Sequence, residues 1–412
     1  MAHSAGGKKG PERGVQEARL QLAAIGLESE FAVLLDGEQV APEDVFGDPR
    51  AFLRGNLMHR RGTSYHLPTG GAIYFDTGVM EIATPVIEIA RGCGARAGRS
   101  LWEGIHFVRT ELDAWERRHG RDVKLVGFSA HYNVSFEIPR EAQGTRRTVQ
   151  KLALLLAYML PFPVMLFATN RRSTGVGVRP RGDRIEVTVD FTPSPSLMIA
   201  TATVITGIVR GVMTWDSFDL DALERERIPV VRDFRPAKHT SRRGWLANIG
   251  CYDRNPFSCD IDGDPWPTTT GEDLTLRRIA RTILARFWPS IGRIADPFTR
   301  RLIRSVARGT SPSLLELDDR PREYEDVGRD STWETLYPPR VLSRSRYERV
   351  LIRAISGQKL HVGGRWYTPV GMRGWSQVVF RDEGNGERRT FSIDSLLRHL
   401  HRWEHPPLRA RA

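Results

Sequence analysis

The sequence predicts an α+β fold in which a curved antiparallel sheet is backed by helices and a small α+β domain follows at the C-terminus. Two observations lead to this fold class. Polar and apolar residues alternate along segments that are typical of strands with one buried face, at residues 22–35, 70–85, 124–136 and 178–191. Long apolar stretches separate the later segments and can cover that buried face as helices.

Length and charge set the first bounds. The chain has 412 residues, and we expect a disordered tail over residues 1–20, a main domain over residues 21–340 and a small domain over residues 341–412. The formal net charge is +12 at pH 7, and arginine dominates the basic residues. Such a charge favours nucleotide phosphates, an acidic protein partner or nucleic acid.

Cysteine usage and the N-terminal segment indicate a cytoplasmic protein. The three cysteines form no CxxC pair, so we expect them to be reduced, and residues 1–20 lack the apolar run of a signal peptide. The longest uncharged run is residues 152–170, and Pro161 and Pro163 interrupt it. It predicts a buried helix that ends near Met159 and a buried strand from Val164, with no membrane span.

Two acidic side chains share one face of the first predicted strand, residues 22–35. Glu28 and Glu30 are two positions apart, so both project to the same side. Leu27 and Phe31 take the other side. Paired carboxylates on a half-buried strand are costly without a cation, and hard oxygen ligands suit Mg²⁺ or Mn²⁺. The alternative is an edge strand with a solvated acidic face.

Residues 70–85 predict a β-hairpin that turns at Thr77-Gly78. The polar residues of the hairpin are Tyr74, Asp76 and Glu81, and glycines at both sides allow the backbone to approach a ligand closely. The alternative is an ordinary hairpin with solvated acids.

Two segments flank this hairpin. Residues 54–61 are basic and lie in a loop-rich region, where they could close over a substrate. Residues 88–119 predict a helical region that is interrupted near residues 92–98.

The strand predicted over residues 124–136 places His131, Asn133 and Ser135 on one face. A histidine and an asparagine that project together from a central strand indicate a site. The alternative is a buried histidine that is satisfied within the core.

Residues 178–191 predict one strand that begins in a basic segment. Arg179 and Arg181 precede Glu186, which occupies the polar face of the strand. Arginines at this place can clamp phosphate oxygens in a bidentate manner. The alternative is a charged loop that leads into an exposed strand.

The remaining segments support the helical layer and the C-terminal domain. We predict helices over residues 197–215, 272–288, 297–308, 346–355 and 392–403. The basic residues between 232 and 243, which include His239, form either a second anion-binding loop or a solvated one. Trp366, Tyr367 and Trp375, interleaved with arginines, could bind an acidic peptide or single-stranded nucleic acid, or serve the core.

As a set, these segments resemble the carboxylate–amine ligases of the glutamine synthetase superfamily over residues 22–215. Four motifs are similar to the branch of γ-glutamate–cysteine ligase type 2. They are Gly-Leu-Glu-x-Glu-Phe at 26–31, Glu-Ile-Ala-Thr-Pro at 81–85, Arg-Arg-His-Gly at 117–120 and Arg-Pro…Ile-Glu-Val…Asp at 179–190. The run from Ala72 to Thr84, which contains Tyr, Asp-x-Gly and Glu-x-Ala-Thr, is similar to the Pup ligase and depupylase branch.

The resemblance implies a curved sheet of the glutamine synthetase catalytic type and an ATP-dependent ligase that uses two or three Mg²⁺ ions, with Mn²⁺ as an alternative metal. A carboxylate would attack ATP to give an acyl phosphate, and an amine would displace the phosphate. The implied metal ligands are Glu28, Glu30, Glu81, His131 and Glu186. The residues implied to contact ATP are Tyr74, Asn133, Arg179 and Arg181. Asp76 would act as the base toward the amine, and the two arginines would neutralise the transferred phosphoryl group.

Three functions remain open from the sequence. The first is the ligase, acting on a small substrate pair or on an acidic peptide or small protein modifier. The second is an amidase of depupylase type on the same fold. The third is a catalytically weakened binding protein whose basic face holds nucleic acid or a protein partner.

Overall fold

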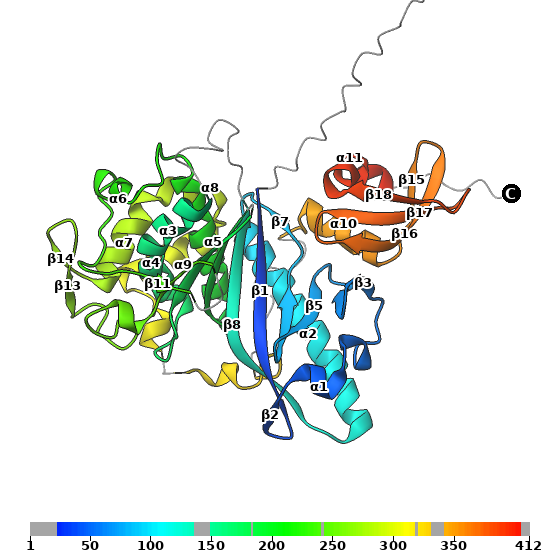
Figure 1. Cartoon of the computed structure of the whole chain (residues 1–412), viewed down its shortest axis with the longest axis horizontal. Coiled ribbons are helices and arrows are strands. Elements are labelled where there is room, and N and C mark those ends of the chain that lie inside the picture. Colours follow the sequence, from blue (N-terminus) through cyan, green and yellow to red (C-terminus); the bar gives the residue numbers. More distant parts are fainter. Residues whose placement is uncertain are drawn as a thin grey trace, which may run out of the picture.

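A computed structural model describes residues 23–135, 149–182, 184–239, 243–317, 320–330 and 342–404. Within these ranges the largest feature is a twelve-stranded sheet in which neighbouring strands pair in an antiparallel manner (Figure 1). From edge to edge it contains β11 (Ala237–Lys238), β12 (Trp245–Ala247), β9 (Val176–Arg181), β10 (Arg184–Asp190), β8 (Val123–Ser135), β1 (Ala24–Leu35), β6 (Val79–Ala83), β5 (Ala72–Asp76), β4 (Ser64–His66) and β3 (Met58–Arg61). Also paired with β1 are β2 (Glu38–Val40) and β7 (Ile87–Glu88).

Two smaller sheets and a set of helices complete the described chain. The smaller sheets are β13 (Pro265–Pro267) with β14 (Asp273–Thr275), and β15 (Leu360–Val362), β16 (Arg365–Arg373), β17 (Gln377–Asp382) and β18 (Arg388–Ser392). The helices are α1 (Pro42–Phe46), α2 (Cys93–His119), α3 (Val149–Met159), α4 (Pro161–Ala168), α5 (Pro195–Val212), α6 (Asp221–Arg225), α7 (Leu276–Arg286), α8 (Trp288–Ile294), α9 (Pro297–Arg308), α10 (Arg346–Ile355) and α11 (Ile393–Glu404). Single 3-10 turns lie at Pro49–Ala51, Ile249–Cys251, Leu314–Glu316 and Arg322–Tyr324.

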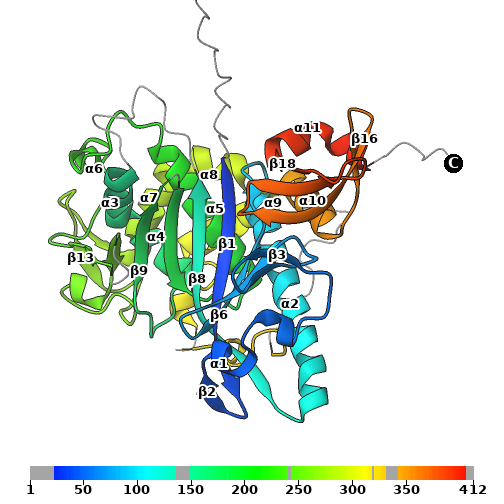
Figure 2. The same cartoon turned by 45° about the vertical axis from the view of Figure 1, so that its right-hand side comes forward.

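Strand alternation explains how the large sheet buries one face. In β1, Leu27, Phe31 and Val33 are almost completely buried, and in β8 Tyr132 and Val134 are buried in the same layer. Helices α2 and α5 pack on this side of the sheet and against each other (Figure 2). The predicted antiparallel sheet backed by helices is therefore confirmed, and the opposite face remains available for polar side chains.

Helix α2 runs without interruption over 27 residues, so the break predicted near residues 92–98 is wrong. The glycines that suggested the break serve close helix packing. A Cβ atom on Gly94 would lie 2.3 Å from Oγ1 of Thr203, and one on Gly98 would lie 2.6 Å from Cγ1 of Ile199. Both partners lie on α5, so the glycines let the two helices touch.

The strand predicted from Val164 is also wrong, because Pro161–Ala168 forms α4. Pro161 occupies the start of the helix, where proline costs no hydrogen bond, and Pro163 still lies in the first turn. The prolines therefore separate two helices instead of ending helical structure. The helix predicted over residues 272–288 likewise begins only at Leu276, after the short strand β14.

Of the described helices, α5 is apolar and long enough to cross a membrane, and the bent pair α3 and α4 passes the same test when taken together. However, 83% of the apolar stretch in α5 is buried inside the protein. This burial is what a core helix of a large sheet requires, since its apolar residues already contact β8, α2 and α9.

The C-terminal residues form a four-stranded sheet, β15 to β18, which we call the C-terminal sheet, with α10 and α11 packed on it. Its core includes Leu351, Phe380 and Trp403 and is distinct from the main core. Met58 of β3 joins this second core, so the C-terminal sheet is docked on the edge of the large sheet. The boundary predicted at residues 340 and 341 and the tail predicted over residues 1–20 lie outside the described residues.

Candidate active site

The pairing register brings the predicted acidic residues onto the exposed face of the large sheet. Glu28 of β1 lies opposite His131 of β8. On the other side of β1, Glu30 lies opposite Glu81 of β6. On the other side of β8, Glu186 of β10 lies opposite Asn133, which is two positions after His131. Because cross-strand neighbours project to the same face, the four strands place all five side chains together.

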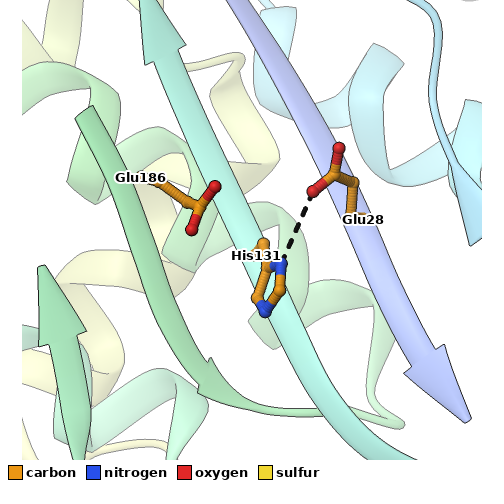
Figure 3. A group of neighbouring side chains, drawn as sticks. All are labelled: Glu28, His131 and Glu186. Carbon is orange, nitrogen blue, oxygen red and sulfur yellow. Dashed lines mark ion pairs between the residues drawn. The ribbon is translucent and has the colours of Figure 1, made fainter. Parts of the chain in front are cut away.

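Glu28, His131 and Glu186 form the most compact group. Each offers one ligand atom, and these atoms all lie within 4.8 Å of one another (Figure 3). The imidazole of His131 also lies between two carboxylates: its Nδ1 is 3.4 Å from Oε2 of Glu28, and its Nε2 is 3.2 Å from Oε1 of Glu30. The histidine predicted on this strand therefore occupies the centre of the acidic face.

The charges of this group shift the pKa values of its members. Burial alone would lower the pKa of His131, but the hydrogen bond to Glu28 and the charges of Glu30 and Glu186 raise it above its ordinary value. Burial alone would raise the pKa of Glu28, but the hydrogen bond and charge of His131 hold it below its ordinary value. The neighbouring carboxylates thus favour the protonated form of His131.

At Glu81 the charge of His131 opposes the effect of burial only weakly. Burial, together with the charges of Glu30 and Glu28, raises the pKa of Glu81 to about 8, although a hydrogen bond from Tyr74 opposes the rise. Tyr74 faces Glu81 directly across β5 and β6. Burial and the same negative charges raise the pKa of the Tyr74 hydroxyl. Around Glu81 the nearby charges are therefore mainly those of carboxylates.

Arginines neutralise the other end of the face. Two paired strands, β9 and β10, are present where one strand was predicted, and their register places Arg179 directly opposite Glu186. Both Arg179 and Arg181 form ion pairs with the Glu186 carboxylate, and Nε of Arg181 is 3.0 Å from Oε2. Glu186, a predicted metal ligand, thus forms ion pairs with both arginines that were predicted to bind phosphate.

Asn133 links the acidic face to a third arginine. Its Nδ2 donates to Oε2 of Glu28 at 3.4 Å, and its Oδ1 accepts from Nε of Arg184 at 2.9 Å. Ser129 donates to Glu30 from the same strand. The sequence contained a signal for Ser129, because it lies two positions before His131 and so shares its face.

Asp76 lies apart from the compact group. It occupies the end of β5, is exposed, and accepts a hydrogen bond from the Thr77 hydroxyl at 3.0 Å. It shares a face with Tyr74, which is two positions earlier on the strand. The predicted hairpin is present, and its turn uses positive φ angles at Thr77 (53°) and Gly78 (88°), as a tight hairpin turn requires.

Two further residues come from the segments that the sequence marked as basic, residues 54–61 and 232–243. His239 of the basic segment places Nε2 3.5 Å from Oγ1 of Thr188 on β10. Arg60 of β3 lies with its guanidinium carbon 5.6 Å from the ring centroid of Tyr74. Only the strand order of the folded sheet brings these positions together.

Neither a protein family nor a curated protein matches this sequence. A crystal structure of the complex between the prokaryotic ubiquitin-like protein Pup and its ligase PafA is similar over 95% of this chain and 98% of that chain, with a TM-score of 0.50 and 10% identity. A structure of the Pup ligase PafA in complex with ADP covers 87% of this chain and 93% of its own, with a TM-score of 0.36 and 11% identity. The chain thus shares the fold of the PafA chain in that complex with Pup.

Proposed function

We propose that this protein is an ATP- and Mg²⁺-dependent ligase that joins a carboxylate to an amine through an acyl phosphate. The observation that carries the proposal is the compact group of Glu28, His131 and Glu186, whose ligand atoms lie within 4.8 Å of one another beside two arginines. The Pup ligase-like fold supports the proposal by analogy, because the similar chain is a ligase.

The donor set fits a hard divalent cation. Carboxylate oxygens dominate it and one imidazole nitrogen completes it, which suits Mg²⁺ and also Mn²⁺. Glu28, Glu30, Glu81 and His131 would hold the metal, together with Glu186. The raised pKa of Glu81 fits the same reading, because a buried carboxylate keeps its proton where no cation stands beside it. A bound cation would neutralise phosphate charge and orient the phosphate oxygens.

Arg179 and Arg181 would serve the transferred phosphoryl group. Each guanidinium has five N–H donors, and the contact with Glu186 occupies only part of them. A phosphate bound next to Glu186 would therefore meet two fixed positive charges. Such preorganised charge is the main source of catalysis in phosphoryl transfer.

Asp76 would act on the amine substrate. Its carboxylate is exposed at the strand end, where an incoming ammonium group can reach it and lose a proton. We propose an acidic peptide or a small protein modifier as one substrate, because the chain carries a net charge of +12 and the similar PafA chain is in complex with Pup. A cytoplasmic location goes with this proposal.

Titration calorimetry with ATP tests the proposal. We expect wild type to bind ATP in the presence of Mg²⁺, and Glu28→Gln to bind at least ~10-fold more weakly, because the variant loses a charged metal ligand. Glu38→Gln is the matched control, since Glu38 is exposed on β2, the strand next to the end of β1. Binding that is indifferent both to Mg²⁺ and to Glu28 would rule the ligase out.

A further inference from the structure

A cavity of about 660 Å³ lies where the large sheet meets the C-terminal sheet. Its walls include Arg60 and Arg61 of β3, Tyr74 and Asp76 of β5, and Gly374 of the turn between β16 and β17. The volume is within the range of about 300–1,000 Å³ that is typical of small-molecule sites. Tyr74 is at once a wall of the cavity and the cross-strand partner of Glu81, so the cavity opens beside the acidic face.

Arg60 presents a positive charge in this cavity, and no described carboxylate lies at ion-pair distance from it, although its charge also acts on Glu28. Among the described residues none forms an ion pair or hydrogen bond with its guanidinium, which instead rests on two aromatic rings. Its central carbon is 5.6 Å from the ring centroid of Tyr74 and 4.9 Å from that of Trp375. Aromatic faces fix the plane of a guanidinium and leave its N–H edge free to donate.

The C-terminal sheet supplies the support for this arginine. Trp375 follows Gly374 in the β16–β17 turn, and its ring packs edge-on against the buried ring of His66 with centroids 4.9 Å apart. His66 belongs to β4, next to the strand that carries Arg60. The indole ring is therefore fixed against the large sheet while it holds the guanidinium.

We propose that this cavity binds a carboxylate group of the substrate, that Arg60 is the residue that receives it, and that Trp375 of the C-terminal sheet positions Arg60. A guanidinium fixed in one plane pairs with a carboxylate through two parallel hydrogen bonds. This inference rests on the proposed ligase function, because it assigns the cavity next to the metal group to the substrate. It gives the C-terminal sheet a role in substrate binding.

The asymmetry of the cavity favours a substrate over a nucleotide phosphate. Arg60 and Arg61 lie on one strand, while Asp76 contributes a negative charge to the same cavity. A group with several negative charges would be repelled by Asp76, whereas a single carboxylate near an amine satisfies both sides. The phosphate-binding arginines, by contrast, lie on β9, beyond β10 and β8.

Fluorine NMR of protein labelled with 5-fluorotryptophan tests the site directly. Trp375→Phe identifies the resonance of Trp375 by its loss. The probes are hexa-L-glutamate and hexa-L-glutamine, both as C-terminal amides so that only the first carries carboxylates, at constant ionic strength. We expect hexa-L-glutamate to shift the Trp375 signal in a saturable manner and hexa-L-glutamine to leave it unchanged. Equal shifts with both peptides, or no shift, would overturn the inference.

Variants of Arg60 separate charge from geometry. Arg60→Gln should weaken hexa-L-glutamate at least ~10-fold, because a charge-assisted hydrogen bond is lost. Arg60→Lys should recover only part of the affinity, since an ammonium group cannot pair in a bidentate manner. Arg381→Gln, at an exposed position of β17, is the matched control and should bind as wild type does. A loss of affinity in the control equal to that in Arg60→Gln would overturn the inference.

The role of Trp375 is tested by Trp375→Leu against Trp375→Phe. We expect the leucine variant to bind hexa-L-glutamate more weakly and the phenylalanine variant to retain most of the affinity, with Mg²⁺-dependent ATP binding unchanged in both. Loss of ATP affinity in Arg60→Gln would assign Arg60 to the nucleotide and overturn the inference. If wild type binds no ATP but the Trp375 signal still responds to hexa-L-glutamate, the carboxylate site stands and the ligase function fails.

Discussion

Replacing Glu81 by glutamine should stabilise the metal-free protein and lower its affinity for Mg²⁺. Glu81 is 4% exposed and lies opposite Glu30 on the acidic face. The pKa of its carboxyl is raised to about 8, so the folded protein prefers the protonated form. Glutamine has nearly the same shape, carries no charge and can still accept a hydrogen bond from Tyr74.

The size of the effect follows from the two pKa values. The ordinary value is 4.5 and the folded value is about 8, so stability is fully present below pH 4.5 and is lost as the pH rises to 8. At about 1.4 kcal/mol for each pH unit, the upper limit of the loss is about 5 kcal/mol. Because Glu28 and Glu30 relax as Glu81 ionises, we expect roughly 2 kcal/mol to be measurable.

Urea denaturation followed by circular dichroism at pH 5 and pH 8.5 measures this loss. In EDTA, Glu81→Gln should exceed wild type by roughly 2 kcal/mol at pH 8.5 and by less at pH 5. Added Mg²⁺ should stabilise wild type and change Glu81→Gln little, because the variant lacks a ligand charge. If wild type in EDTA is as stable at pH 8.5 as the variant, the pKa of Glu81 is not raised by its surroundings.

Three further predictions concern packing, metal and chemistry. Gly94→Ala should lower the free energy of unfolding, measured by heat or urea, by about 1–3 kcal/mol, because its Cβ would lie 2.3 Å from the Thr203 hydroxyl. Adding Thr203→Ala to this variant should restore part of the lost stability. Gly371→Ala is the control and should be as stable as wild type, because no atom lies within 4 Å of its Cβ position. Mn²⁺ affinity measured by electron paramagnetic resonance should fall as the pH is lowered, because the raised pKa of His131 makes protons compete with the metal; affinity that rises at low pH would contradict this. Asp76→Asn should lower turnover ~10²–10⁴-fold with ATP affinity retained, and equal turnover would exclude Asp76 as the base.

The local part of the fold was readable from the sequence. Alternation in residues 22–35 and 124–136 predicted β1 and β8, and period two alone placed Glu28 with Glu30 and His131 with Asn133. These residues came close because their strands are neighbours and register follows the buried face. The acidic group was therefore predictable once the strands were known to pair.

Long-range geometry was not readable in the same way. The glycines of α2 were taken as helix breakers because their partner, α5, lies about a hundred residues further along the chain. Pro161 indicated an end of helical structure, yet proline also fits the first turn of a new helix. Arg60 gained its position from Trp375, and no local pattern links residues so far apart.

The acidic face has two ways to balance its charge, and the difference between them connects stability to function. Without metal, Glu81 retains its proton up to about pH 8, the raised pKa of His131 favours its protonated form, and the arginines of β9 form ion pairs with Glu186. A divalent cation would compete with these protons and with the arginines for the same side chains. The strands then need not move, because the exchange is one of charge at fixed positions. A site of this kind should be rigid in backbone and sensitive to pH, which is the behaviour that the Glu81 and His131 measurements examine together.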